Sequence, residues 1–110
     1  ATKKKVNDAV DFIDSNYSRI DMSLNLVADT IGVNASYLSN IFKKEKGCSL
    51  SKYLTQTRLE QAKKYLTEYP DKTLIEIAES IGYSDVYYFS KNFKKYYGIS
   101  PSKYQEERKM

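Results

Sequence analysis

Hydrophobic residues recur every three or four positions along most of this chain, the spacing that gathers side chains on one face of an α-helix. The pattern predicts an all-α fold of about seven helices, separated by capping and turn residues. The expected helices cover residues 3–17, 24–31, 35–46 and 50–69, a fifth that opens with the capping box at 73–76, a sixth between Ser84 and Gly98, and a last one at 102–109.

The sixth helix is predicted to have two different faces. Ser84 is expected to cap its first turn and Gly98 to end it, because glycine takes the left-handed conformation without strain. At 100° per residue, Phe89, Phe93 and Tyr96 fall on one side and face a core. The opposite, outward stripe consists of Tyr87, Lys91 and Lys94.

The helix at 35–46 has a similar pattern, with Leu38, Ile41 and Phe42 directed inward. Its outward stripe consists of Ser36, Asn40 and Lys43, flanked by Ser39 and Lys44. Ser and Asn are weaker helix formers than the residues expected on a merely solvated face. Their short donor and acceptor groups suit base edges in the major groove of DNA, and an ordinary polar surface is the alternative interpretation.

The chain contains an internal duplication. Residues 24–33 align with 74–83 at an offset of 50, and residues 34–53 align with 85–104 at an offset of 51 with ten identities in twenty positions. The shared residues include F-K-K, S-K-Y and the turn glycines. Each copy reads as a helix, a glycine-containing turn and a helix, which is the arrangement of a helix-turn-helix.

The longest helix lies between the two copies and begins after Ser49. Its length of roughly 28–30 Å compares with roughly 34 Å for one turn of DNA, so a stiff helix would set the separation of two reading helices. We therefore expect a first helix-turn-helix subdomain at 1–48, a linker helix at 49–69 and a second subdomain at 70–110. Arg58, on or near the apolar face of this helix, is assigned a structural role in preference to a phosphate contact.

Composition narrows the function classes. Eighteen basic and fourteen acidic residues give a net charge of +4, and the segments 34–46 and 81–99 each carry +2 while 71–80 carries −2. This distribution favours phosphate contact by the second helix of each copy.

The single cysteine and the absence of histidine argue against a disulfide, a cysteine zinc site and histidine catalysis, so we expect neither an enzyme nor a metal site. No stretch resembles a signal peptide or a membrane span, which predicts a cytoplasmic protein, and the missing initial methionine suggests a fragment or a processed chain.

The chain resembles the DNA-binding domain of AraC/XylS-type transcriptional regulators in its duplicated helix-turn-helix, its long helix and the stretch 82–104, G-Y-S-D-V-Y-Y-F-S-K-N-F-K-K-Y-Y-G-I-S-P-S-K-Y. The resemblance covers nearly the whole chain and is especially close to C-terminal domains of response regulators or ligand-sensing activators. It implies binding to a double-stranded DNA operator without a cofactor or a membrane, as the output module of a bacterial regulator. A sensor or receiver domain missing from this sequence and RNA polymerase are the further partners it implies.

The resemblance also implies roles for individual residues, because the family inserts the second helix of each unit into successive major grooves. Family members often have arginine or tryptophan where this chain has Asn40 and Ser36, and asparagine favours adenine where arginine favours guanine. The implied base-facing residues are Ser36, Ser39 and Asn40 in the first unit and Val86, Tyr87, Ser90 and Lys91 in the second. The implied phosphate contacts are Lys43 and Lys94, with Lys44 and Lys95 beside them.

One alternative is a helical protein-interaction module that kept this fold and lost DNA binding. An enzyme is the third hypothesis, and the scattered acidic residues give it little support. Affinity that falls with salt and prefers one duplex sequence would separate the DNA-binding hypothesis from the interaction module.

Overall fold

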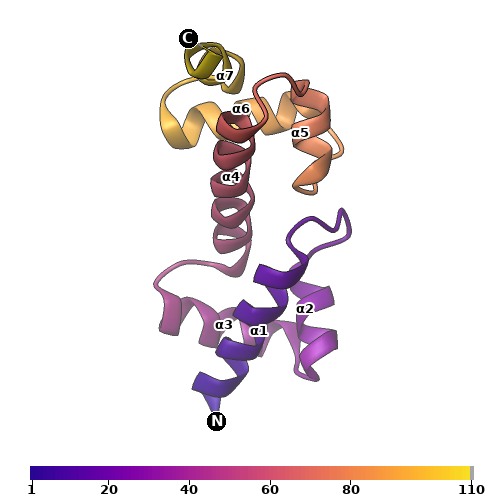
Figure 1. Cartoon of the computed structure of the whole chain (residues 1–110). Coiled ribbons are helices and arrows are strands. Elements are labelled where there is room, and N and C mark those ends of the chain that lie inside the picture. Colours follow the sequence, from indigo (N-terminus) through magenta and orange to yellow (C-terminus); the bar gives the residue numbers. More distant parts are fainter. Residues whose placement is uncertain (110) are drawn as a thin grey trace. The chain divides into compact units, whose positions relative to one another are not determined.

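A computed structural model describes residues 1–109, and this part of the chain consists of helices and the turns that connect them (Figure 1). The helices are α1 (Thr2–Asn16), α2 (Leu24–Ile31), α3 (Ala35–Lys46), α4 (Leu50–Glu68), α5 (Leu74–Ser80), α6 (Val86–Tyr97) and α7 (Pro101–Lys109). The all-α prediction is therefore confirmed, and the helix ends lie within two residues of the expected ones, with α2 and α3 as expected. No helix in the described residues is both long and apolar enough to cross a membrane.

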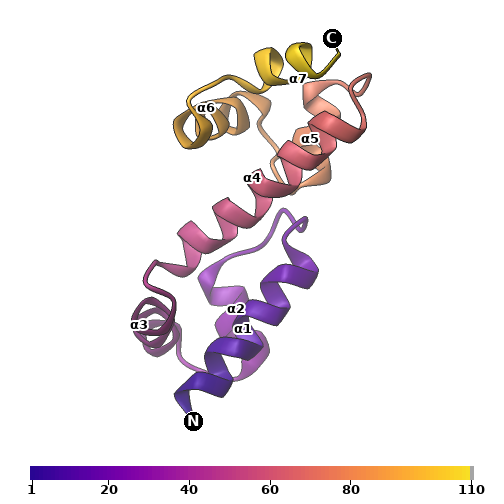
Figure 2. The same cartoon turned by 60° about the vertical axis from the view of Figure 1, so that its left-hand side comes forward.

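The chain divides into two compact units, Ala1–Thr57 and Arg58–Met110. In the first unit α1, α2 and α3 pack against one another, as both views of the molecule show (Figures 1 and 2), and the start of α4 completes the core. Phe42 of α3 lies at the centre of this core and meets the ring of Tyr53 edge-on, with 5.7 Å between ring centroids. The buried side chains are Val6, Ala9, Ile13, Met22, Val27, Ala28, Leu38, Ile41, Phe42, Leu50 and Leu54.

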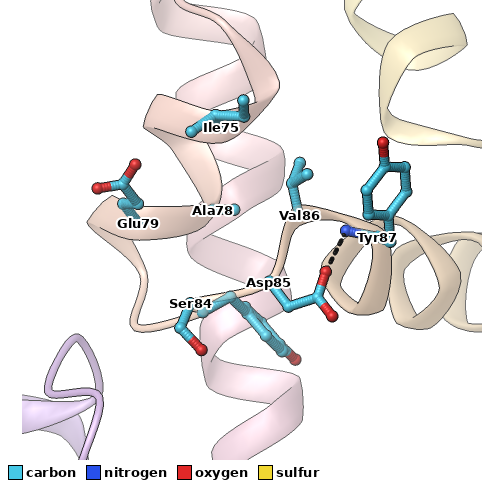
Figure 3. Close-up of a pocket in the computed structure, with 8 residues that line it drawn as sticks. Ile75, Ala78, Glu79, Ser84, Asp85, Val86 and Tyr87 are labelled. Carbon is cyan, nitrogen blue, oxygen red and sulfur yellow. Dashed lines mark hydrogen bonds between the residues drawn. The ribbon is translucent and has the colours of Figure 1, made fainter.

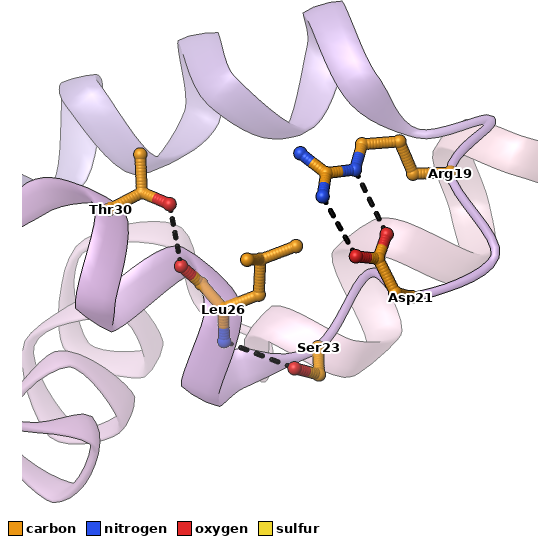
Figure 4. Close-up of polar contacts among 5 residues, drawn as sticks. All are labelled: Arg19, Asp21, Ser23, Leu26 and Thr30. Carbon is orange, nitrogen blue, oxygen red and sulfur yellow. Dashed lines mark hydrogen bonds and ion pairs between the residues drawn. The ribbon is translucent and has the colours of Figure 1, made fainter.

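The loop between α1 and α2 is held by polar contacts (Figure 4). Arg19 donates two hydrogen bonds to the carboxylate of Asp21, from Nε at 2.9 Å and from Nη2 at 2.7 Å. These hydrogen bonds lower the pKa of Asp21 and raise that of Arg19. Ser23 then caps α2 by accepting from the backbone N–H of Leu26 at 3.0 Å. These contacts therefore fix the conformation of the loop just before α2, the first helix of the first helix-turn-helix.

The second unit has an aromatic core. The rings of Phe89 and Phe93 lie 5.9 Å apart, and Phe93 also meets Tyr104 of α7 at 5.8 Å. Tyr96, expected to face inward with these two residues, is only half-buried; Tyr97 packs on Phe93 at 4.8 Å. The buried hydrophobic side chains of this unit are Leu59, Ala62, Leu66, Ile77, Ala78, Ile81, Tyr83, Phe89, Phe93 and Tyr104.

Helix α4 contributes to both cores, each through one half. Leu54 belongs to the first core and Leu59, five positions later, to the second, so no single stripe at three- to four-residue spacing describes the helix. Tyr69, the last residue of the helix expected at 50–69, follows the observed helix and is 47% exposed. The boundary between the two units, Thr57/Arg58, falls within α4.

Arg58 lies at the middle of α4, where the second unit begins, with its guanidinium carbon 5.5 Å from the centre of the Tyr83 ring. Partial burial lowers the pKa of the guanidinium, and the hydroxyl of Tyr83 opposes this shift. The stacked geometry gives Arg58 a structural contact within its own unit.

The N-cap of α6 differs from the expected one. Asp85, not Ser84, accepts hydrogen bonds from the backbone N–H groups of Tyr87 and Tyr88, at 2.9 Å and 3.4 Å. A capping side chain reaches the second and third N–H groups of its helix, and Ser84 lies one position too early to do so because α6 begins at Val86.

Candidate nucleic-acid interface

The turns of both helix-turn-helix units contain an equivalent backbone hydrogen bond, although the second copy has one extra residue before its second helix. The backbone N–H of Val33 donates to the carbonyl of Ala28 at 2.9 Å, and Tyr83 donates to Ala78 at the same distance. Gly32 adopts a φ of 77° at this turn, a left-handed conformation that favours glycine. Equivalent residues thus form equivalent hydrogen bonds, as the internal duplication predicts.

The second helices, α3 and α6, also begin in the same way. Asn34 caps α3 by accepting from the N–H groups of Ser36 and Tyr37, at 2.8 Å and 3.2 Å, which matches the role of Asp85 in α6. The caps fix where each helix starts and therefore which side chains follow its first turn.

The outward face of α3 carries the polar residues that the sequence predicted. Because Leu38, Ile41 and Phe42 are buried, the opposite face of the helix is presented to solvent. On this face Ser36, Asn40, Lys43 and Lys44 are exposed and Ser39 is half-buried. We call these five residues the first ridge.

The outward face of α6 repeats the arrangement. Burial of Phe89 and Phe93 directs the other side of the helix outward. Tyr87, which is 83% exposed, Lys91, Lys94 and Lys95 lie on the exposed surface, and Val86 and Ser90 are half-buried. We call these six residues the second ridge.

The chemistry of the ridges changes along each helix. Hydroxyl, amide and apolar groups occupy most positions in the first turns, and lysines occupy the last turn. Within residues 1–109, the lysines of both ridges form no ion pair with an acidic side chain, so their charges remain available to an anionic ligand. Hydrogen-bonding groups followed by cations suit base edges and phosphates respectively.

Sequence reasoning missed three exposed apolar side chains near these helices. Tyr37 and Tyr88 are 46% and 57% exposed, and the ring of Tyr88 lies 5.9 Å from that of Tyr83. Ile75 on α5 is 56% exposed. Ile75 directly follows Leu74 but falls outside the stripe that Leu74, Ile77 and Ile81 form at helical spacing, and this is the sequence signal that could have identified it as exposed.

Ile75 borders a cavity of about 290 Å³ between α5 and the start of α6 (Figure 3). Ala78 and Glu79 line it from α5, and Val86 and Tyr87 line it from α6. The second helix-turn-helix therefore has a hollow beside the first residues of its second helix. No group of three or more histidine, cysteine or acidic side chains in the described part of the chain is arranged to hold a metal ion.

Known proteins share this fold and sequence pattern. A family model described as a helix-turn-helix domain matches residues 27–107. The Msm operon regulatory protein of Streptococcus mutans is 38% identical, over 97% of this chain and 38% of its own length. The probable transcription factor PqrA of Proteus vulgaris is 32% identical, over 96% of this chain and 86% of its own length.

The solved structure of the C-terminal domain of AraT, a response regulator from Geobacillus stearothermophilus, superimposes with a TM-score of 0.90 at 37% identity. The match covers 94% of this chain and 84% of that one. The chain spans only 14% to 38% of the length of the first three curated relatives it matches. Together these similarities confirm the family resemblance, and the chain belongs to the AraC-type helix-turn-helix family of transcriptional regulators.

Proposed function

We propose that this chain binds double-stranded DNA sequence-specifically, with α3 and α6 in successive major grooves. The observation that carries the proposal is the repetition of one exposed ridge on two helices that begin with equivalent caps. An α-helix fits the major groove of B-DNA, and a helix-turn-helix reads bases from the N-terminal part of its second helix.

Base contacts are assigned to the early parts of the two ridges. In α3 they are Ser36, Ser39 and Asn40, and in α6 they are Val86, Tyr87, Ser90 and Lys91. Short hydroxyl and amide groups form hydrogen bonds with base edges, and a lysine favours the acceptors of guanine.

Phosphate contacts are assigned to Lys43, Lys44, Lys94 and Lys95, which lie in the last turns of α3 and α6. Contacts of this kind fix the position of the protein on the duplex and carry no sequence information. They also make affinity depend on salt, because each neutralised phosphate releases counterions.

The spacing of the two half-sites follows from α4 in this proposal. Its 19 residues extend for about 28 Å, close to the roughly 34 Å of one duplex turn. We therefore expect two base-contacted segments whose centres lie about one helical turn apart.

The biological role extends beyond this chain. We propose that it is the output module of a bacterial transcription regulator, joined in the whole protein to a sensor or receiver domain and acting with RNA polymerase in the cytoplasm. The matched operon regulator and response regulator support this role, since each is a longer protein or a domain of one.

Selection from a pool of random duplexes with the purified 110-residue chain tests the DNA-binding function. We expect enrichment of a bipartite sequence, and an affinity for it that falls steeply as salt rises. Binding that is salt-dependent but without sequence preference would reject base reading by the ridges. No binding to duplex DNA would favour the alternative, a helical protein-interaction module.

A further inference from the structure

The cavity beside the start of α6 has an apolar wall made from two helices. Ile75 and Ala78 come from α5, and Val86 and Tyr87 are the first two residues of α6 (Figure 3). Its volume of about 290 Å³ is roughly ten times the share of one water molecule in the liquid. The cavity is therefore large enough for a methyl group and the adjoining edge of a base.

Two side chains of this wall are unusually exposed for their type. Ile75 is 56% exposed and Tyr87 is 83% exposed, and both lie at the same cavity. Exposed apolar groups that gather at one place mark a binding surface more often than apolar groups that are scattered singly.

We propose that this cavity takes the 5-methyl group of one thymine in the half-site read by α6. The inference rests on the proposed function, because it requires the start of α6 to lie in the major groove. The thymine methyl is the apolar group that base pairs display in that groove, and side chains at the start of a recognition helix are the ones that reach base edges.

The charged groups at the cavity favour a base over a phosphate. Glu79 and Asp85 border the cavity with carboxylates, and Figure 3 shows the Glu79 side chain directed away from Val86. These carboxylates repel the negatively charged phosphates of the DNA backbone. An uncharged group, such as a base, is therefore the better partner for the apolar wall.

The first unit provides an internal comparison. Asn25, Ala35 and Ser36 occupy the positions equivalent to Ile75, Val86 and Tyr87. The first copy thus lacks all three of the larger apolar side chains. The proposal therefore assigns methyl reading to the second half-site alone.

Replacement of thymine by deoxyuridine tests the proposal, because it removes the methyl group and keeps the base pair. Each thymine of the selected duplex is replaced in turn, and the dissociation constant of the 110-residue chain is measured. We expect one replacement in the α6 half-site to weaken binding about fourfold, the value for one buried methylene-sized group.

Two variants locate the effect. Val86→Ala and Ile75→Ala should each bind the thymine and the uracil duplex with nearly equal affinity. Ile20→Ala changes another exposed isoleucine, outside both ridges, and should retain the fourfold preference for thymine. Circular dichroism and the melting temperature establish that each variant is folded.

Each result has a definite meaning. If the chain selects a duplex but tolerates uracil at every position, the methyl-reading proposal is wrong while the proposed function stands. The proposal also fails if the preference for thymine persists in both cavity variants, since the methyl group would then be read elsewhere. If no duplex is preferred, the proposed function fails and the methyl-reading inference fails with it.

Discussion

At the scale of single residues, the two ridges differ where Asn40 in the first copy aligns with Lys91 in the second. Asn40 carries an amide that both donates and accepts, whereas Lys91 carries only donors. An amide matches the paired donor and acceptor of adenine, and a lysine matches the acceptors of guanine. The two copies therefore share a fold and present different reading groups.

Asn40→Ala should relax the base preference at one position of the first half-site and leave the other positions unchanged. A bidentate amide contributes about 1–3 kcal/mol of discrimination, so we expect the preferred base at that position to lose this advantage. Asn40 is exposed, and its removal leaves the core of the unit intact. Affinities for a panel of duplexes with each base at each position provide the measurement, and an unchanged preference would show that α3 does not read this base through Asn40.

Lys43→Ala is the matched comparison in the last turn of the same helix. Loss of one phosphate contact should weaken binding to all duplexes alike and make the slope of log affinity against log salt shallower by about one unit. A sequence-dependent loss would instead place Lys43 at a base. The two variants together separate the reading part of the ridge from its anchoring part.

At the scale of helices, the structure assigns the N-cap of α6 to Asp85, where the sequence predicted Ser84. We expect Asp85→Ala to lower the free energy of unfolding by about 0.5–2 kcal/mol, because two backbone N–H groups lose their acceptor. Ser84→Ala, one position earlier on the exposed surface, should change stability by less than about 0.5 kcal/mol. Urea denaturation measures the free energy of unfolding of both variants. A larger loss for Ser84→Ala than for Asp85→Ala would show that Ser84 is the cap.

The capping box of α5 gives a prediction about pH. Hydrogen bonds from the backbone N–H and hydroxyl of Thr73 lower the pKa of Glu76 below its usual value of 4.5. A carboxyl whose pKa is lowered on folding stabilises the fold above the pKa of the unfolded chain, and this contribution disappears as pH falls through the folded pKa. Wild-type stability should therefore fall more on acidification below about pH 4.5 than that of Glu76→Gln, whose amide oxygen still accepts a hydrogen bond.

Melting temperatures at pH 6 and pH 3 compare the two proteins. Glu79→Gln removes a charge from the same helix without touching the capping box, and it serves as the control. Equal acid sensitivity of the wild type and Glu76→Gln would show that the carboxylate of Glu76 contributes nothing specific.

Helix positions were largely predictable from the sequence because burial follows the three- to four-residue spacing within one helix. The regular spacing breaks where one helix serves two cores, between Leu54 and Leu59, and the cap of α6 was misassigned because Ser84 and Asp85 are adjacent and both good caps. The ridges were predictable for the same reason, since an outward stripe is the complement of an inward one. The cavity at Ile75 was not, because it depends on how closely α5 approaches α6.

At the scale of the whole molecule, the proposal makes α4 a spacer of fixed length between two reading helices. Insertion of 5 bp between the half-sites of the selected duplex turns one half-site by about half a turn, so only one unit would reach its bases. Insertion of 10 bp restores the orientation but lengthens the separation by about 34 Å, more than a continuous 19-residue helix spans. Both duplexes should bind as weakly as one in which a half-site is scrambled. Recovery of full affinity with the 10 bp insertion would mean that the two units adjust their separation and that α4 does not fix it.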